Sequence, residues 1–321
     1  MSRPFLAAAF ASLALLPAPS PAADFPDVLD VPAVASPLAS KSLLNGLARA
    51  GKRIVAVGQR GHILYSDDSG QTWMQAKVPV SSDLVAVAFP TGSQGWAVGH
   101  DAVLLHTADA GLTWTRQLDG RSTGQNAENP FLDVWFENER AGFVVGAFNQ
   151  VLRTSDAGTT WESWSDRAEN PKALHLYAIR RCGENVFIAG EQGLLLKLDA
   201  QAGRFRAVEM PYKGTLFGIA CGARSAIVFG LRGNAFRSLD GGESWQKIET
   251  GLQVGITAAA SAAGRIVLVS QAGHVLASVD DGATFKPLKI ERPVPAAAVT
   301  GADGNLIVVA GPRGVRAQRL D

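Results

Sequence analysis

The sequence predicts an all-β fold, a seven-bladed β-propeller built from four-stranded antiparallel blades. Three observations predict it: an apolar strand pattern that recurs seven times, a turn octapeptide that follows most copies at a fixed distance, and a composition rich in apolar and turn-forming residues. Of the 321 residues, 47% are hydrophobic and 34 are glycine, which supports a large core with many turns.

The strand pattern is a run of apolar residues that ends in a small residue. Its copies occupy residues 54–58, 95–99, 142–146, 186–190, 226–230, 266–270 and 307–311. The closing residues are 40 to 47 positions apart, which is the length of one four-stranded propeller blade. Seven copies therefore predict seven blades in one domain.

The octapeptide has the form S/T-x-D-x-G-x-S/T-W/F and is the Asp box. Five copies match it, and their aspartates lie ten residues after the closing residue, at Asp68, Asp109, Asp156, Asp240 and Asp280. The fourth repeat has Ala200 there, preceded by Asp199, and the seventh has Asp321. In such a turn Asp and Ser/Thr accept bonds from backbone N–H groups, and glycine supplies a positive φ. We therefore expect these aspartates to hold hairpins and not to be catalytic.

The N-terminus has the features of a secretory signal. A positively charged start precedes an apolar run over residues 5–16 and a small-residue site at Ala22 and Ala23. The apolar run is shorter than the roughly 20 residues needed to span a bilayer. We expect cleavage near Ala22 or Ala23 and export to the periplasm or an equivalent compartment, which leaves residues 24–321 as the propeller.

The seventh repeat stops at Asp321, before an outer strand. The spare strand-like segment 25–34 precedes the first repeat. Because bare strand edges are a hazard, we expect this N-terminal strand to complete the last blade and close the ring.

The overall charge offers no attraction for nucleic acid or anionic membranes. The formal net charge is +1, and removal of the signal with Arg3 brings it to zero. The glycine-rich segment 230–233 joins two strands and does not open a helix, so it lacks the N–H cluster that holds phosphates. The two cysteines have no second ligand pair at metal spacing. We expect no metal, no cofactor and no small-molecule substrate.

Cys182 and Cys221 fall at the ends of the inner strands of neighbouring blades. An exported protein meets an oxidising compartment, which favours a disulfide between them. The two positions are offset by one residue, which argues against the bond because adjacent side chains in a strand point to opposite faces. Two unpaired buried thiols remain the alternative.

The Asp boxes resemble those of the BNR/Asp-box superfamily. Seven repeats with G-x-x-G turns, as in Gly58-Gln-Arg-Gly61, resemble the Ycf48/Hcf136-type photosystem II assembly factors over the whole mature chain. The resemblance implies a non-enzymatic, exported propeller that binds a membrane-protein partner through an arginine-rich patch. It also implies an alternative role as an accessory protein of an RND-type exporter.

The same superfamily includes sialidases and other glycosidases, which is the enzyme alternative. A sialidase-like site would need an arginine triad, a Phe/Tyr-Arg-Ile-Pro motif and a Tyr–Glu pair, and the motif is absent. Asp133, Glu137 and Glu139 are the remaining acids that a two-carboxylate mechanism would use. We expect no enzymatic activity.

Arginines on the turns between second and third strands are the candidate contacts for a partner. Arg60, Arg232 and Arg313 lie two positions after the closing residues of blades one, five and seven. Forked guanidinium groups suit the carboxylates of an acidic or C-terminal protein segment, while three separate solvated arginines are the alternative. Arg121 and Arg167, in long links between blades, are further candidates. We expect a monomer that binds a protein.

Overall fold

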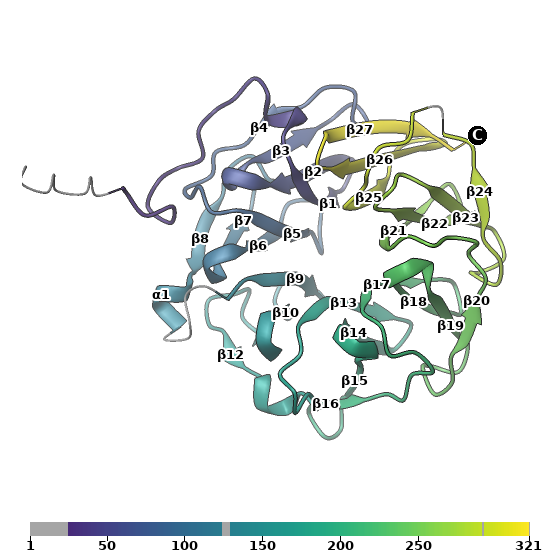
Figure 1. The fold of residues 1–321 in the computed structure, drawn as a ribbon. Coiled ribbons are helices and arrows are strands. Elements are labelled where there is room, and N and C mark those ends of the chain that lie inside the picture. Colours follow the sequence, from purple (N-terminus) through teal and green to yellow (C-terminus); the bar gives the residue numbers. More distant parts are fainter. Residues whose placement is uncertain (1–24, 124–128, 291, 321) are drawn as a thin grey trace, which may run out of the picture.

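The computed structural model describes residues 25–123, 129–290 and 292–320. Seven antiparallel sheets are arranged as a ring around a central axis, as Figure 1 shows, so the predicted seven-bladed propeller is confirmed. Each chain segment from one blade's first strand to its last runs outward from the axis. No helix in the described ranges is long and apolar enough to cross a membrane.

The strands fall into four concentric sets. The inner strands are β1 (Leu44–Ala50), β5 (Leu84–Ala88), β9 (Phe131–Phe136), β13 (Leu176–Cys182), β17 (Leu216–Cys221), β21 (Ile256–Ala262) and β25 (Ala298–Gly301). The second strands are β2 (Arg53–Gly58), β6 (Gly95–Gly99), β10 (Gly142–Gly146), β14 (Asn185–Gly190), β18 (Ala226–Gly230), β22 (Arg265–Ser270) and β26 (Leu306–Gly311). The third strands are β3 (Ile63–Ser66), β7 (Leu104–Thr107), β11 (Val151–Thr154), β15 (Leu195–Asp199), β19 (Ala235–Ser238), β23 (Val275–Ser278) and β27 (Gly314–Arg319). The outer strands are β4 (Met74–Gln75), β8 (Thr115–Leu118), β12 (Glu162–Ser163), β16 (Arg204–Ala207), β20 (Gln246–Ile248) and β24 (Lys286–Leu288).

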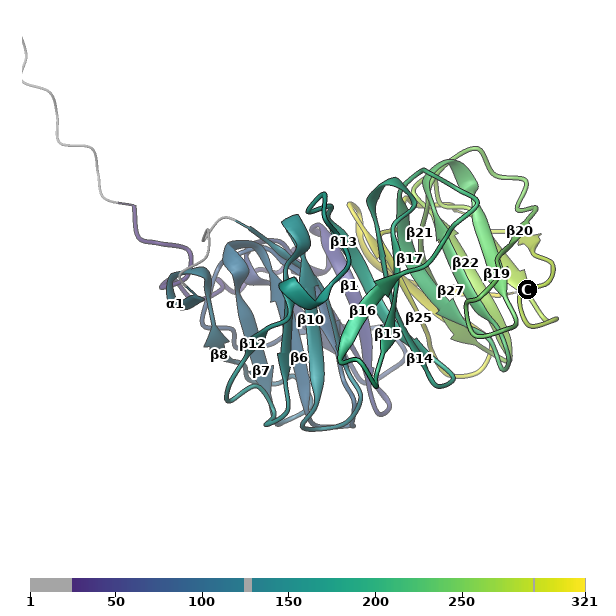
Figure 2. The same ribbon diagram turned by 90° about the horizontal axis from the view of Figure 1, so that it is seen from below.

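Short helical segments connect the strands. They are α1 (Gly120–Thr123) and the 3-10 turns η1 (Ala39–Lys41), η2 (Gln59–Gly61), η3 (His100–Ala102), η4 (Ala147–Asn149), η5 (Ser165–Arg167), η6 (Glu191–Gly193) and η7 (Leu231–Gly233). Five of them, η2, η3, η4, η6 and η7, join second to third strands. We call the side of the ring that carries these turns the loop face and the opposite side the Asp-box face; Figure 2 shows the ring edge-on between them.

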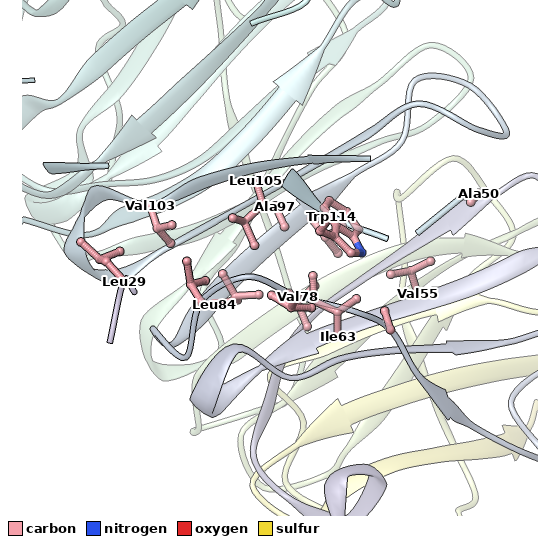
Figure 3. Packing of buried hydrophobic residues seen from close by; sticks show 14 residues of the cluster. Leu29, Ala50, Val55, Ile63, Val78, Leu84, Ala97, Val103, Leu105 and Trp114 are labelled. Atoms are coloured by element: carbon pink, nitrogen blue, oxygen red, sulfur yellow. The ribbon is translucent and has the colours of Figure 1, made fainter. Parts of the chain in front are cut away.

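The core lies between neighbouring blades. The second strands are almost wholly buried because a sheet covers each of their two faces, which explains their continuous apolar runs. In Figure 3 the cluster between blades one and two includes Val55 and Ile63 on one side and Ala97, Leu105 and Trp114 on the other. Trp114, the aromatic residue of the second Asp box, is buried in this cluster beside its own blade.

The five Asp boxes form the predicted hairpin contacts. In the first, the Asp68 carboxylate accepts bonds from the Thr72 N–H and hydroxyl, at 2.8 and 2.5 Å, and from the Ser66 hydroxyl at 2.8 Å. The Gly70 N–H donates to Ser66 Oγ at 2.8 Å. The bond from the Thr72 hydroxyl is the main reason that the pKa of Asp68 falls to about 2. Equivalent aspartate bonds form at Asp109, Asp156, Asp240 and Asp280.

The prediction that the N-terminal strand completes blade seven is wrong. In the described part of the chain, blade seven has three strands, and residues 25–43 form none. Segment 25–34 lies instead beside the chain that leaves β4: the Ala33 N–H donates to Val78 O, and the Ser81 N–H donates to Val28 O. Leu29 is buried in the core between blades one and two, where Figure 3 shows it. Apolar burial and backbone bonds thus seat this segment on blades one and two.

The Cys182–Cys221 disulfide is present, which confirms that prediction. The two Cα atoms are 5.1 Å apart, within the range that a disulfide requires. Cys182 pairs with Asn185 and Cys221 with Ala226, so each lies where its inner strand ends and turns back. The bond links blades four and five at the Asp-box face.

Candidate protein-binding face

The loop face repeats one backbone turn in five blades. The central residue of each turn has φ between 53° and 56°, and these residues are Arg60, Asp101, Phe148, Gln192 and Arg232. In η2 the following Gly61 has φ 68°, and a Cβ on it would come within 2.1 Å of the Val80 carbonyl oxygen. A left-handed conformation costs a residue with a side chain roughly 1–2 kcal/mol. The packed link between blades fixes the turn and leaves four of the central side chains exposed, while Asp101 is half-buried and accepts a hydrogen bond from the Ser82 hydroxyl.

The structure places Arg60, Arg232 and Arg313 on this face, all exposed. Arg60 and Arg232 share the left-handed turn, but Arg313 does not: it lies in a two-residue hairpin between β26 and β27. The side chains of all three form no ion pair or hydrogen bond with a described residue, although the Arg60 backbone N–H donates to Asp83 Oδ1 at 2.7 Å. Blades seven and one are neighbours, so Arg313 and Arg60 lie on adjacent blades, while blade six separates Arg232 from both.

Arg121 and Arg167 are engaged within the chain. Arg121, in α1, binds Asp30 with two nitrogens at 2.8 and 3.1 Å and also contacts Asp27 and Asp119. These bonds tie the N-terminal segment to blade two. Arg167 pairs with Glu162 at 2.9 Å and lies over the Trp164 ring. Both arginines therefore have structural partners, and a role in binding another protein stays a prediction.

An aromatic row that sequence reasoning missed lies beside the central channel on the loop face. The rings of Phe148, His175, Tyr177 and Phe217 follow one another at centroid distances of 4.5, 6.4 and 5.8 Å. Phe148 is 58% exposed, and its N–H donates to Nδ1 of His175. Burial, with the nearby Glu191 carboxylate, raises the pKa of Tyr177. Tyr177 and Phe217 occupy equivalent positions in the repeat, a signal that alignment of the inner strands contains.

The central channel, of about 250 Å³, is lined by inner strands of all seven blades. At the inner-strand position that pairs with the residue before the closing residue of the second strand, six blades have a small residue, namely Gly46, Ala86, Ala178, Gly218, Ala258 and Ala298. Blade three has Asp133, which is 4% exposed. Its carboxylate accepts bonds from Arg180 Nη1 at 2.5 Å and from the N–H groups of Ile179 and Val134. Burial raises the pKa of Asp133, and the charge of Arg180 opposes that rise.

This arrangement argues against a two-carboxylate hydrolase site. Asp133 is saturated by three donors, and Glu137 pairs with Arg181 at 2.6 Å. Across the described ranges no group of three or more His, Cys, Asp or Glu is arranged to hold a metal ion.

Known proteins resemble this chain in sequence. The sequence pattern of a family described as "Photosynthesis system II assembly factor YCF48" matches residues 49–127 and 122–292. Two curated relatives are named "Photosystem II stability/assembly factor HCF136, chloroplastic". The one from Oryza sativa subsp. japonica is 33% identical over 93 residues, 24% of this chain and 22% of the relative. The one from Arabidopsis thaliana is 35% identical over 66 residues, 19% of this chain and 16% of the relative. The aligned region thus spans about a fifth of each relative's length.

Solved structures share the fold over most of the chain. YCF48 bound to a D1 peptide superposes with a TM-score of 0.70 and 16% identity, covering 88% of this chain and 94% of that one. YCF48 from Cyanidioschyzon merolae gives 0.69 and 17%, with coverage of 88% and 97%. The WD40 propeller domain of Doa1 gives 0.67 at 9% identity, covering 91% and 97%. At such identities the likeness shows the fold alone.

Proposed function

Because this chain belongs to the YCF48 family of photosystem II assembly factors, we propose that it is a non-enzymatic scaffold that assists the assembly or stability of a membrane-protein partner. The observation that carries the proposal is the set of exposed arginines on the loop face that form no ion pair with any described residue, Arg60, Arg232 and Arg313. Function concentrates on loops that a rigid scaffold holds, and the repeated turn is such a scaffold.

The chemistry of the loop face suits an acidic or C-terminal protein segment. Guanidinium groups donate forked pairs of hydrogen bonds to carboxylates, and the exposed Phe148 beside the channel adds an apolar contact. A relative of this fold has been solved with a D1 peptide bound, which supports a peptide segment as the recognised element.

The proposal also covers location and assembly. The signal-like residues 1–23 support export to a periplasm or equivalent compartment, with the mature chain acting as a monomer. An exporter of the RND type is the alternative partner, and the experiment below separates it from a photosystem subunit by the identity of the captured protein.

The test places a photo-crosslinking residue at Arg60 or Arg232 in cells and, as a control, at Val279 on the Asp-box face, which is 81% exposed. We expect an integral membrane protein to be captured from the first two positions and not from the third. Binding of that protein is then measured for the charge-reversed variant R60E/R232E/R313E. Surface turn substitutions change stability by less than about 0.5 kcal/mol, so the fold should persist while affinity falls. Equal capture from all three positions, or unchanged affinity, would contradict the proposal.

A further inference from the structure

No strand among the described residues pairs with the outer edge of blade seven. The other six blades have a fourth strand, but in the described residues β27 is the outermost strand of its sheet, and Figure 1 shows it on the rim of the ring. The Leu320 N–H donates to Asn305 O, so Gln318, Arg316 and Gly314 also direct their backbone groups toward β26. The N–H and C=O groups of the alternate residues Val315, Ala317 and Arg319 then point outward. No described residue bonds to these groups.

The outer edge of β27 is as long as the outer strands of the other blades. Outer strands in the other blades are short, two residues in β4 and three in β20 and β24. The turn η1 covers only the start of β27, where Ser40 O approaches Gly314. The open stretch 315–319 is therefore long enough to pair with a strand of ordinary length for this ring.

Two grooves whose described charged residues are all basic flank β27. The groove toward blade six has a volume of about 430 Å³, and the groove toward blade one has a volume of about 700 Å³. Among the described residues, their linings hold six cations and no acid: Lys41, Lys289, Arg292, Arg313, Arg316 and Arg319. None of the six pairs with a described acid. By sequence alone, segments 286–292 and 313–321 hold six basic residues against two acidic ones, Glu291 and Asp321.

We propose that this edge takes an extended, acidic segment of a partner protein as the fourth strand of blade seven. Outward backbone donors and acceptors match a polypeptide backbone, and the surrounding cations match acidic side chains. The chain's own residues 1–24 hold one acid, Asp24, and one base, Arg3, so they lack the charge that the grooves select. Arg313 belongs both to this surface and to the loop-face candidates, but the turns that carry Arg60 and Arg232 lie on other blades, so the proposal does not rest on the function proposed above.

The test uses the full chain and a blocked eight-residue peptide of alternating Glu and Thr. We expect binding that weakens with salt, and slowing of hydrogen exchange at the amides of Val315, Ala317 and Arg319 by at least about tenfold at saturation. The variant R316E/R319E should lose at least about tenfold in affinity because like charges then meet across the edge. The control R206E/K247E makes the same charge change on outer strands of blades four and five and should bind normally.

Four results would overturn the proposal. The first two are no binding, and binding without slower hydrogen exchange in β27. The third is slow exchange of these amides before any peptide is added, which would show that another part of the chain covers the edge. The fourth is equal binding of the same peptide with every amide N-methylated, or of a single-stranded DNA oligonucleotide, which would show that the surface recognises negative charge alone. Loss of binding in R60E/R232E with binding retained in R316E/R319E would assign the peptide to the loop face.

Discussion

Replacing Asp133 by alanine should destabilise the ring, although alanine or glycine is the residue at this position in every other blade. The substitution removes the acceptor for Arg180 and for the N–H groups of Ile179 and Val134. Breaking a buried ion pair from one side costs about 3–5 kcal/mol. The Arg180 side chain is 43% exposed to the channel, so water solvates part of the stranded charge and lowers the expected cost to about 2–3 kcal/mol.

The double variant D133A/R180A should recover part of that loss. Blade two has Ala86 and Ala88 at the equivalent positions, so the ring accommodates alanine at both. We expect a coupling energy of about 1–2 kcal/mol in a cycle of D133A, R180A and the double variant, measured by urea unfolding at constant m-value. Additivity within about 0.5 kcal/mol would show that the two side chains act independently and would refute the reasoning.

Three further outcomes are expected. C182A/C221A should lower the free energy of unfolding by about 2–4 kcal/mol, and thiol titration of the unfolded, unreduced protein should find no free thiol; two would contradict the bond between Cys182 and Cys221. The free energy of unfolding should fall as the pH drops from about 4 toward 2, because hydrogen bonds hold the pKa of Asp68 at about 2 against 3.8 in the unfolded chain. If the variant Asp68→Asn shows the same dependence of the free energy of unfolding on pH, Asp68 contributes nothing to that dependence. Charge reversal of Arg121 should change global stability by less than about 1 kcal/mol but speed limited proteolysis within residues 25–34, and equal cleavage rates would mean that apolar seating alone holds this segment.

Local patterns predicted the ring because each blade repeats the same turn chemistry at the same spacing. The Asp boxes are an example: Asp68 contacts atoms within its own hairpin, so a single octapeptide contains the whole interaction. The disulfide was within reach because Cys182 and Cys221 both end inner strands, and the strand turns there relax the one-residue offset.

Contacts between distant segments were beyond sequence reasoning. The N-terminal segment was assigned to blade seven by counting strands. Its position depends instead on where Leu29 can be buried and where partners such as Val78 O and Arg121 are available for hydrogen bonds. The Asp133–Arg180 pair likewise joins residues of neighbouring blades, and only the register of two inner strands brings them together.

The turns of the loop face separate backbone geometry from side-chain identity. Arg60, Asp101, Phe148 and Gln192 begin from the same dihedral angles although they share no chemistry. Neighbours such as Gly61, and the carbonyl that packs against it, favour this conformation in η2. The central side chains differ in their surroundings: Arg60 and Gln192 are exposed, whereas the Asp101 carboxylate accepts a hydrogen bond from the Ser82 hydroxyl. Charge can therefore be transposed from one blade to the next, for example by exchanging Arg60 with Gln192, without reshaping the ring. The binding preference of this face can therefore change by substitution of one turn residue at a time.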